Sequence, residues 1–347
     1  MIEIDGSEGE GGGQIIRSSL ALSAITGRPV RITKIRAGRK SGGLKRQHVT
    51  AVNAIATICD AEVSGAEIGS STLAFHPKSI RAGDYSFAIG TAGSTSLVAQ
   101  TILPALCVTD KPSTITLDGG THNPFCPPFD FLERSYLPQL AKTGPKVTAN
   151  LEKHGFFPAG GGRIRLEVQP SSSLRGLELM QIEGPIIPTV TAIVSSLPRS
   201  IAEREIDVIR RGTNWPKSNV QGESFRIHEV ADPAGPGNVV IIDLVSSTVT
   251  DVLIAIGEVG RPSERVAKEA LRAARSYIKN QVPVGVYLAD QLILPLSLAT
   301  AQGNASCFRT VRLSQHSQTH IDIVKRFLDL SINCQIDDGG SVTLRFE

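Results

Sequence analysis

Aromatic residues are scarce in this chain, and its net charge is small. Aromatic side chains make up 5% of the 347 residues, whereas glycine alone occurs 33 times. This balance favours glycine-rich loops and close backbone approaches over an aromatic stacking surface. The formal net charge of +3 is too small to indicate unspecific nucleic-acid binding, so contact with RNA or DNA would require a local basic cleft.

Long hydrophobic runs and paired cysteines are also missing. No stretch of about eighteen apolar residues occurs, and no basic-then-apolar leader precedes the strand-like first residues. We therefore expect no membrane contact and a cytoplasmic location, or a nuclear one in a eukaryote. The five cysteines never form a Cys-x-x-Cys pair, which predicts reduced, mostly buried thiols and neither a disulfide framework nor a zinc site.

The chain repeats one pattern three times. In each copy a glycine opens an apolar helix, at Gly12, Gly93 and Gly285. A turn and a strand follow each helix, with the strands at 30–35, 113–117 and 307–313. A polar loop, a second helix and two closing strands come next, with the second helices at 44–59, 128–140 and 321–330. Each unit is therefore predicted to run strand, helix, strand, helix, strand, strand.

The spacing of these glycines indicates an insertion before the third unit. Gly12 and Gly93 are 81 positions apart, whereas Gly93 and Gly285 are 192 apart. The excess of 111 residues has the size of a small domain. We predict an α/β (α+β) fold in which residues 1–183 and 281–347 form a domain of three repeats and residues 184–280 form a smaller inserted α/β domain.

The loops after the second strands are equivalent in the three units, at 36–43, 118–127 and 314–320. The third contains His316, which we interpret as lying on a strand-to-helix loop where an imidazole can reach a ligand. Most loop histidines are solvated, so the argument for a function depends on the other two loops. If the loops converge, all three units share one site.

The most unusual string, residues 6–14, places five glycines and two carboxylates between a strand and a helix. It is not a Walker A loop. The free N–H groups of a glycine-rich helix start suit an anion, and Glu10 is suited to hold a divalent metal beside phosphates. A flexible turn with solvated acids is the alternative, and the residues alone do not decide between the two.

Six cationic or potentially cationic side chains fall within residues 36–48, and they include Arg36, Arg39 and His48. Arg17 joins them from the first helix. Because guanidinium groups match phosphate oxygens, we favour phosphate binding over a solvated basic face.

The prolines of the second loop, including Pro127 and Pro128, offer a flat apolar wall for a nucleobase. Tyr287, at the start of the third glycine-led helix, would stack on the other side, with Asp290 and Gln291 one turn later. A buried tyrosine in an ordinary helix is the alternative, which the repeat argument disfavours.

Taken in order, these motifs resemble the RNA 3′-terminal phosphate cyclase family over nearly the whole chain. The likeness rests on the segments 9–17, 35–39, 46–48, 119–121, 127–128 and 287–291 and on the segment around His316.

The resemblance implies three repeats of a fold like the C-terminal domain of translation initiation factor 3, plus the inserted domain. It implies that ATP and a divalent metal (Mg²⁺ or Mn²⁺) convert an RNA 3′-phosphate end to a 2′,3′-cyclic phosphodiester, with release of AMP and pyrophosphate. His316 would be the catalytic nucleophile that becomes adenylylated, and Glu10 a metal-site residue. The implied nucleotide-binding residues are Arg17, Arg36, Arg39 and Gln100 for phosphates, Pro127 or Pro128 with Tyr287 for adenine, and Asp290 and Gln291 nearby.

In one position the chain departs from the family, because His320 stands where we expect asparagine. Two histidines are therefore candidates, and His316 fits the motif better. A non-catalytic relative in ribosome assembly is an alternative, but such proteins lack the reactive histidine. A transferase of the shikimate or cell-wall type is another, but it needs six units where this length allows three. The oligomeric state and the physiological RNA stay open.

Overall fold

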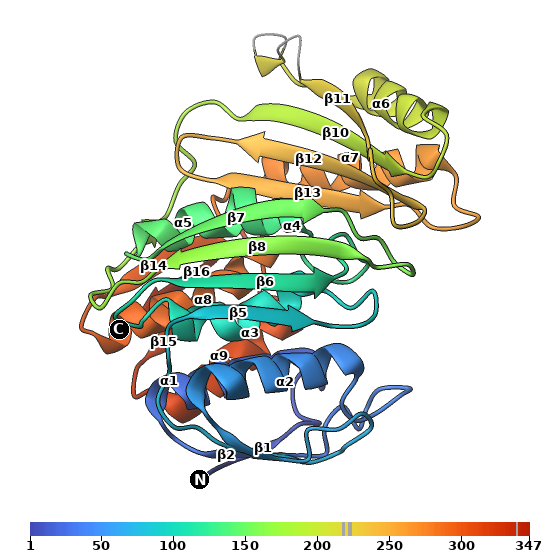
Figure 1. Ribbon diagram of the computed structural model, residues 1–347. Coiled ribbons are helices and arrows are strands. Elements are labelled where there is room, and N and C mark those ends of the chain that lie inside the picture. Colours follow the sequence, from blue (N-terminus) through green and yellow to red (C-terminus); the bar gives the residue numbers. More distant parts are fainter. Residues whose placement is uncertain (217–218, 221–223, 338) are drawn as a thin grey trace.

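The computed structural model describes residues 1–216, 219–220, 224–337 and 339–347. Within these residues the chain forms four four-stranded sheets, which confirms the predicted mixed α/β class. The sheet that contains the N-terminal strand lies at one end of the molecule, and the sheet that contains β10 (Ile187–Ser195) lies at the other (Figure 1).

Three of these sheets share one strand order, in which the first strand is followed by the second, the fourth and the third. In each, the first two strands are parallel and the other neighbours are antiparallel. Each of these sheets and the helices between its strands form one unit. The first unit comprises β1 (Ile2–Asp5), α1 (Gly13–Thr26), β2 (Val30–Thr33), α2 (Arg46–Cys59), β3 (Glu62–Ser64) and β4 (Leu73–His76). The second comprises β5 (Asp84–Ala88), α3 (Thr95–Leu106), β6 (Ser113–Gly119), α4 (Phe129–Phe131), η1 (Leu132–Tyr136), α5 (Leu137–Lys142), β7 (Lys146–Lys153) and β8 (Gly162–Gln169). The third comprises β9 (Glu178–Leu179), α8 (Val286–Ala301), β14 (Ser306–Thr310), α9 (Gln315–Phe327), β15 (Ile332–Ile336) and β16 (Val342–Phe346).

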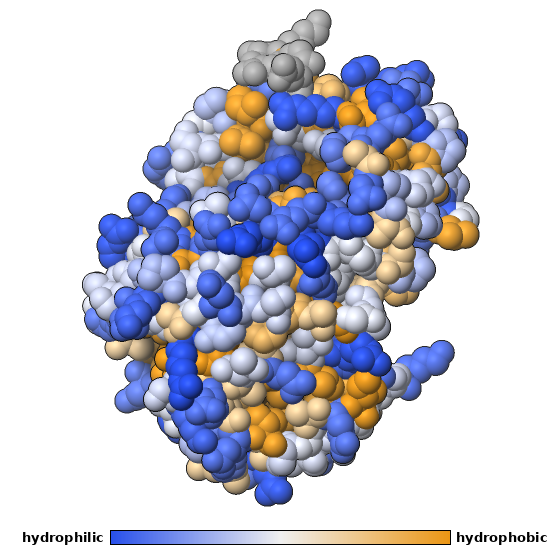
Figure 2. Space-filling view, viewed as in Figure 1, coloured by the Kyte–Doolittle hydropathy of each residue, from blue (hydrophilic) through white to orange (hydrophobic). Residues whose placement is uncertain are grey.

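Alternation of apolar and polar residues explains how these strands lie on the core. In β8, Ile164 and Leu166 are buried, whereas Arg163 faces outward and its Nε donates to Asp118 Oδ1 at 2.7 Å. A two-residue period places alternate side chains on opposite faces of a strand. The outer face of this sheet is the hydrophilic surface across the middle of Figure 2.

The inner faces pack on helices that come from all three units. The first helix α1 contacts both α3 and α9, and α9 also contacts α8. Their buried side chains, such as Leu20, Ile102, Leu292 and Val324, belong to one hydrophobic cluster. This packing joins the three units into one body.

The fourth sheet has a hydrophobic cluster of its own. It has the order β11 (Phe225–Glu229), β10, β12 (Gly237–Val245), β13 (Thr250–Ile256). Two helices, α6 (Ser200–Gly212) and α7 (Ser263–Asn280), cover one face, where their apolar stripes enclose the second cluster. Residues of the opposite face, including Ile241 and Val252, belong to the large cluster instead. The fourth sheet therefore packs against the rest of the protein.

The structure corrects several expectations about individual elements. The second helix of the second unit runs without a break from Phe129 to Lys142 but contains a π-helical turn, in which Leu137 N–H donates to Leu132 O and after which Pro138 has no N–H to give. The strand predicted at 307–313 ends at Thr310. Of the cysteines, all free, only Cys59 and Cys107 are fully buried, so "mostly buried" was wrong.

The helix that follows β14 begins six residues earlier than predicted. Ser314 is its N-cap, and the Ser314 hydroxyl accepts a hydrogen bond from Ser317 N–H at 3.0 Å. His316 and His320 therefore lie in α9 and not on a loop. No helix among the described residues combines the length and the apolar character that crossing a membrane requires.

Candidate active site

A cavity of about 1040 Å³ lies where the three units and the fourth sheet meet. Its walls come from the start of α1, the loops after β2 and β6, the start of α8, the start of α9 and strand β13. It brings together every site residue predicted from the sequence: Glu10, Arg17, Arg36, Arg39, Gln100, Pro127, Pro128, Tyr287, Asp290, Gln291 and His316. The loops after β2 and β6 thus converge with the start of α9.

The glycine-rich string holds Glu10 in a buried position. Its side chain is 3% exposed, and its Oε1 accepts a hydrogen bond from Gln14 N–H at 3.1 Å. A Cβ atom on Gly12 would overlap this carboxylate, so only glycine leaves the Glu10 side chain in this position. The Glu10 N–H donates to Thr319 Oγ1, 2.9 Å away on α9. Glu10 is therefore held in a buried position by this turn, whereas the Glu8 side chain is 61% exposed and pairs with Arg326.

His316 lies in the first turn of α9 and faces this carboxylate. The distance from His316 Nδ1 to Glu10 Oε2 is 3.7 Å, and the histidine side chain remains 55% exposed. Gln315 Nε2 donates to Gly9 O at 2.9 Å and fixes the same turn to the glycine-rich string. The imidazole is thus both positioned and open to the cavity.

His320, one turn further along α9, is buried instead. Its Nδ1 lies 3.0 Å from Asp290 O, and its Nε2 has no hydrogen-bond partner within the described chain. It lines a separate void of about 20 Å³ and not the large cavity. The two histidines that the sequence left as candidates therefore occupy different environments.

The three predicted arginines play different parts in this structure. Arg39 Nη2 contacts Glu10 twice, at 2.6 Å from Oε2 and 2.8 Å from the carbonyl oxygen. Arg36 braces its own loop, because its Nη1 donates to the carbonyl oxygens of Ser41 and Gly43. Arg17 is buried and donates to Gln14 Oε1 at 2.7 Å.

Arg17 also presents an unsatisfied donor. Its buried Nε finds no hydrogen-bond partner among the residues that the structure describes. Burial lowers the pKa of Arg17, and the carboxylates of Asp290 and Glu10 act in the opposite direction. An unpaired buried donor is costly, so this group is suited to an anionic ligand.

Of the six cationic or potentially cationic side chains within residues 36–48, His48 is buried and adds no positive charge. Burial, together with the nearby positive charges of Arg17, Arg36 and Lys45, lowers the pKa of His48 to about 3. The His48 ring is therefore neutral, and its Nδ1 accepts a hydrogen bond from Lys45 N–H at 3.0 Å. Among the described residues, five cationic side chains and two carboxylates line the cavity: Arg17, Arg36, Arg39, Lys45, Arg46, Glu10 and Asp290.

An apolar wall faces these charges. Pro127 and Pro128 line it, together with Tyr287, which is 59% exposed and not the buried tyrosine of the alternative interpretation. Val252 and Ile254 of β13 also line the cavity and were not predicted, because no local pattern in the sequence reveals this long-range contact. Phe125 and Phe157 were not predicted either, although both are aromatic residues beside prolines in a chain with few aromatics.

A divalent metal fits this site only with help from a ligand. The described residues contain no group of three His, Cys, Asp or Glu side chains that could hold a metal. Mg²⁺ is commonly bound by one or two carboxylates, with phosphate oxygens and waters completing the octahedron, and Mn²⁺ favours similar oxygen ligands. Glu10 can supply such a carboxylate.

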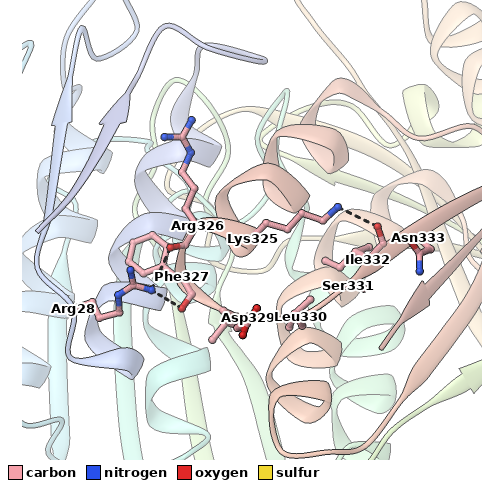
Figure 3. Close-up of a pocket in the computed structure, with 10 residues that line it drawn as sticks. Arg28, Lys325, Arg326, Phe327, Asp329, Leu330, Ser331, Ile332 and Asn333 are labelled. Atoms are coloured by element: carbon pink, nitrogen blue, oxygen red, sulfur yellow. Dashed lines mark hydrogen bonds between the residues drawn. The ribbon is translucent and has the colours of Figure 1, made fainter.

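A second cavity of about 350 Å³ lies at the other end of α9 (Figure 3). Its cationic groups are engaged with main-chain oxygens, since Arg28 Nη1 donates to Phe327 O at 2.9 Å and Lys325 Nζ donates to Ile332 O at 3.1 Å. Cations at a helix C-terminus satisfy its free carbonyl groups. None of the predicted site residues lines this cavity. Its cationic side chains are explained by their contacts at the C-terminal end of α9.

Residues 8–334, which include both Glu10 and His316, match the family described as RNA 3′-terminal phosphate cyclase. The chain belongs to this family. An RNA 3′-terminal phosphate cyclase of Koribacter versatilis (strain Ellin345) is 47% identical over 334 residues, covering 95% of this chain and 91% of that protein. That of Ectopseudomonas mendocina (strain ymp) is 46% identical over 335 residues, covering 96% and 94%. That of Ralstonia nicotianae (strain ATCC BAA-1114 / GMI1000) is 44% identical over 342 residues, covering 98% and 95%.

The predicted resemblance to the RNA 3′-terminal phosphate cyclase family is thereby confirmed. The prediction of an enzyme is confirmed with it, because the relatives are named as enzymes.

Proposed function

We propose that this protein uses ATP to convert the 3′-terminal phosphate of an RNA to a 2′,3′-cyclic phosphodiester through an adenylylated His316. One observation carries the proposal. The half-exposed His316 imidazole lies 3.7 Å from the buried Glu10 carboxylate, at the edge of a cavity lined by arginines. A nucleophile, its orienting group and a set of phosphate-binding cations occur in one place.

In the first step, His316 attacks the α-phosphorus of ATP. A bond forms from nitrogen to phosphorus, and the bond to the departing pyrophosphate breaks. The neutral imidazole is the reactive form, so activity is lost as His316 takes up a proton. A proton on Nδ1, directed toward Glu10, leaves the lone pair of Nε2 free for this attack.

Adenylylation makes the RNA end reactive. An oxygen of the 3′-phosphate takes the AMP group from His316, which breaks the nitrogen–phosphorus bond and frees the histidine. The ribose 2′-hydroxyl then attacks the 3′-phosphorus, AMP leaves, and the cyclic phosphodiester forms. The hydroxyl proton passes to a base or to solvent. Three displacements, in which pyrophosphate, the histidine and AMP leave in turn, replace one difficult step.

The cations support each transfer by stabilising negative charge. Arg17 offers its unpaired Nε, and Arg39 extends from Glu10 toward the cavity with a half-exposed side chain. Arg36 and Gln100 also line the cavity and complete the proposed phosphate contacts. A divalent metal at Glu10 would neutralise further phosphate charge when bound.

The apolar wall is the proposed adenine site. Pro127 or Pro128 would cover one face of the base and Tyr287 the other, with Asp290 and Gln291 near the nucleotide. Asp290 Oδ1 is buried and has no hydrogen-bond partner among the described residues, so it is available to accept from a ligand N–H or O–H.

We also infer the domain organisation predicted from the sequence. The three sheets of equal strand order would be repeats resembling the C-terminal domain of translation initiation factor 3, in residues 1–183 and 281–347. The fourth sheet, with its own hydrophobic cluster, would be the inserted domain of residues 184–280. The cytoplasmic location remains a prediction.

The proposal is tested by incubating the protein with ATP, Mg²⁺ or Mn²⁺, and an RNA that bears a 3′-phosphate. We expect release of AMP and an RNA end that resists phosphatase. An RNA with a 3′-hydroxyl is the control and should yield neither. An unmodified 3′-phosphate end after incubation with either metal would contradict the proposal.

A further inference from the structure

Two phenylalanines on the cavity rim have no structural role that explains their position. Phe125 is 102% exposed and Phe157 is 63% exposed, and both line the cavity. Exposed phenylalanine forfeits the stability that burial of its ring would give. In a chain with 5% aromatic residues, two such side chains at one cavity indicate a ligand.

The loops that carry them are fixed to each other. The N–H groups of Thr121 and His122 both donate to Gly155 O, at 2.8 Å and 3.1 Å. A β-bridge pairs His122 with Phe156, the residue before Phe157. His122 is itself buried, with its Nε2 2.7 Å from Asp130 Oδ2. Both aromatic residues therefore extend from a rigid base.

The backbone at Phe125 is also unusual. Its φ of 62° lies in the left-handed region, which bulky side chains rarely adopt. Such conformations concentrate at functional sites, where the surrounding structure enforces them. The geometry presents the ring to solvent at the cavity and not to the core.

The surroundings of these rings match a single-stranded nucleic acid. Five cationic side chains line the same cavity, and proteins that bind single strands combine a positive groove with aromatic side chains on which bases stack. The cavity volume of about 1040 Å³ also reaches the upper end of the range usual for one small ligand. A nucleotide and the end of a polynucleotide can occupy such a space together.

We propose that Phe125 and Phe157 form a stacking platform for the last two nucleobases of the RNA that enters the active site. This inference rests on the proposed function, since it assigns a binding site for the substrate of that reaction. The adenine of ATP has its own wall at Pro127, Pro128 and Tyr287. Such a platform would run against the expectation that the scarcity of aromatic residues argues against a stacking surface.

The test compares Phe125→Ala, Phe157→Ala and Phe125→Trp with Val259→Ala, a control at a fully exposed apolar residue outside the cavity lining. A 3′-phosphorylated RNA with 2-aminopurine as its last or penultimate base reports binding by fluorescence without any turnover. We expect each alanine variant to bind this RNA about tenfold more weakly. Phe125→Trp and Val259→Ala should bind it within about twofold of the unchanged protein.

The base contact is then tested by removing the base. For each alanine variant, one of the two RNAs with an abasic site at the last or the penultimate position should bind that variant and the unchanged protein equally. The ratio of RNA cyclisation efficiency to ATP adenylylation rate should fall about tenfold in the alanine variants. Equal RNA binding by Phe125→Ala, Phe157→Ala and the unchanged protein would overturn the platform. Failure of the unchanged protein to become adenylylated or to cyclise RNA would instead refute the proposed function.

Discussion

Replacing Thr319 by valine would break one hydrogen bond that joins the first and third units at the active site. The Thr319 hydroxyl accepts from the N–H of Glu10 at 2.9 Å, although the two residues are 309 positions apart. Both are buried, so water does not replace the lost acceptor. A buried donor left without a partner costs about 1–3 kcal/mol. Valine has nearly the same volume as threonine, so no cavity adds to this cost.

The same bond sets the position of His316 relative to Glu10. We therefore expect Thr319→Val to lower the free energy of unfolding by about 1–3 kcal/mol. It should also slow adenylylation, by up to about tenfold for each 1.4 kcal/mol that the displaced geometry costs. Urea unfolding and label transfer from α-labelled ATP measure the two effects.

Thr319→Ser is the matched control, because it keeps the hydroxyl and loses one methyl group. It should retain most of the adenylylation rate. If the valine variant were as stable and as active as the serine variant, the reasoning about the Glu10 N–H would be refuted.

Three further predictions concern pH, backbone space and metal. Burial raises the pKa of Glu205 from 4.5 to about 7, so the folded state retains a proton that the unfolded state releases, and stability falls as pH rises through this window. In Glu205→Gln, the free energy of unfolding, measured with urea, should fall by about 3 kcal/mol less between pH 4.5 and pH 8 than in the unchanged protein. Parallel pH profiles of the two proteins would contradict this prediction. A Cβ on Gly13 would lie 2.7 Å from Arg17 Nη1, so Gly13→Ala should slow adenylylation, whereas Gly38→Ala, with open space around it, should not. Removal of divalent metal by EDTA should abolish adenylylation, and Glu10→Gln should raise the Mg²⁺ concentration needed to restore it; full activity in EDTA would exclude the metal.

The helices and strands near the glycine-led starts were predictable because their signals are local. Gly12 is the N-cap of α1 and Gly285 is the N-cap of α8, as their pattern indicated. Gly93 directly precedes the N-cap of α3. The start of α9 was not recognised, because residues 314–320 are polar and therefore read as a loop. Their polarity has another cause, since Gln315 and Thr319 make hydrogen bonds to the glycine-rich string.

The candidate site was predictable where one repeat position could be compared with the others. That comparison placed Arg39, Pro127 and His316 in one cavity. Contacts made by other parts of the fold were not predictable in this way. Val252 and Ile254 reach the cavity from the fourth sheet, and Arg36 is turned into its own loop by a backbone with φ of 55°. These features depend on tertiary packing that a local pattern does not contain.

The most direct measurement is transfer of label from α-labelled ATP to the purified protein, compared among the unchanged chain, His316→Ala and His320→Asn. His316 is open to the cavity and His320 is buried beside Asp290, so the account predicts a labelled His320→Asn protein and an unlabelled His316→Ala protein. A labelled His316→Ala protein would show that another group is the nucleophile and would contradict the account.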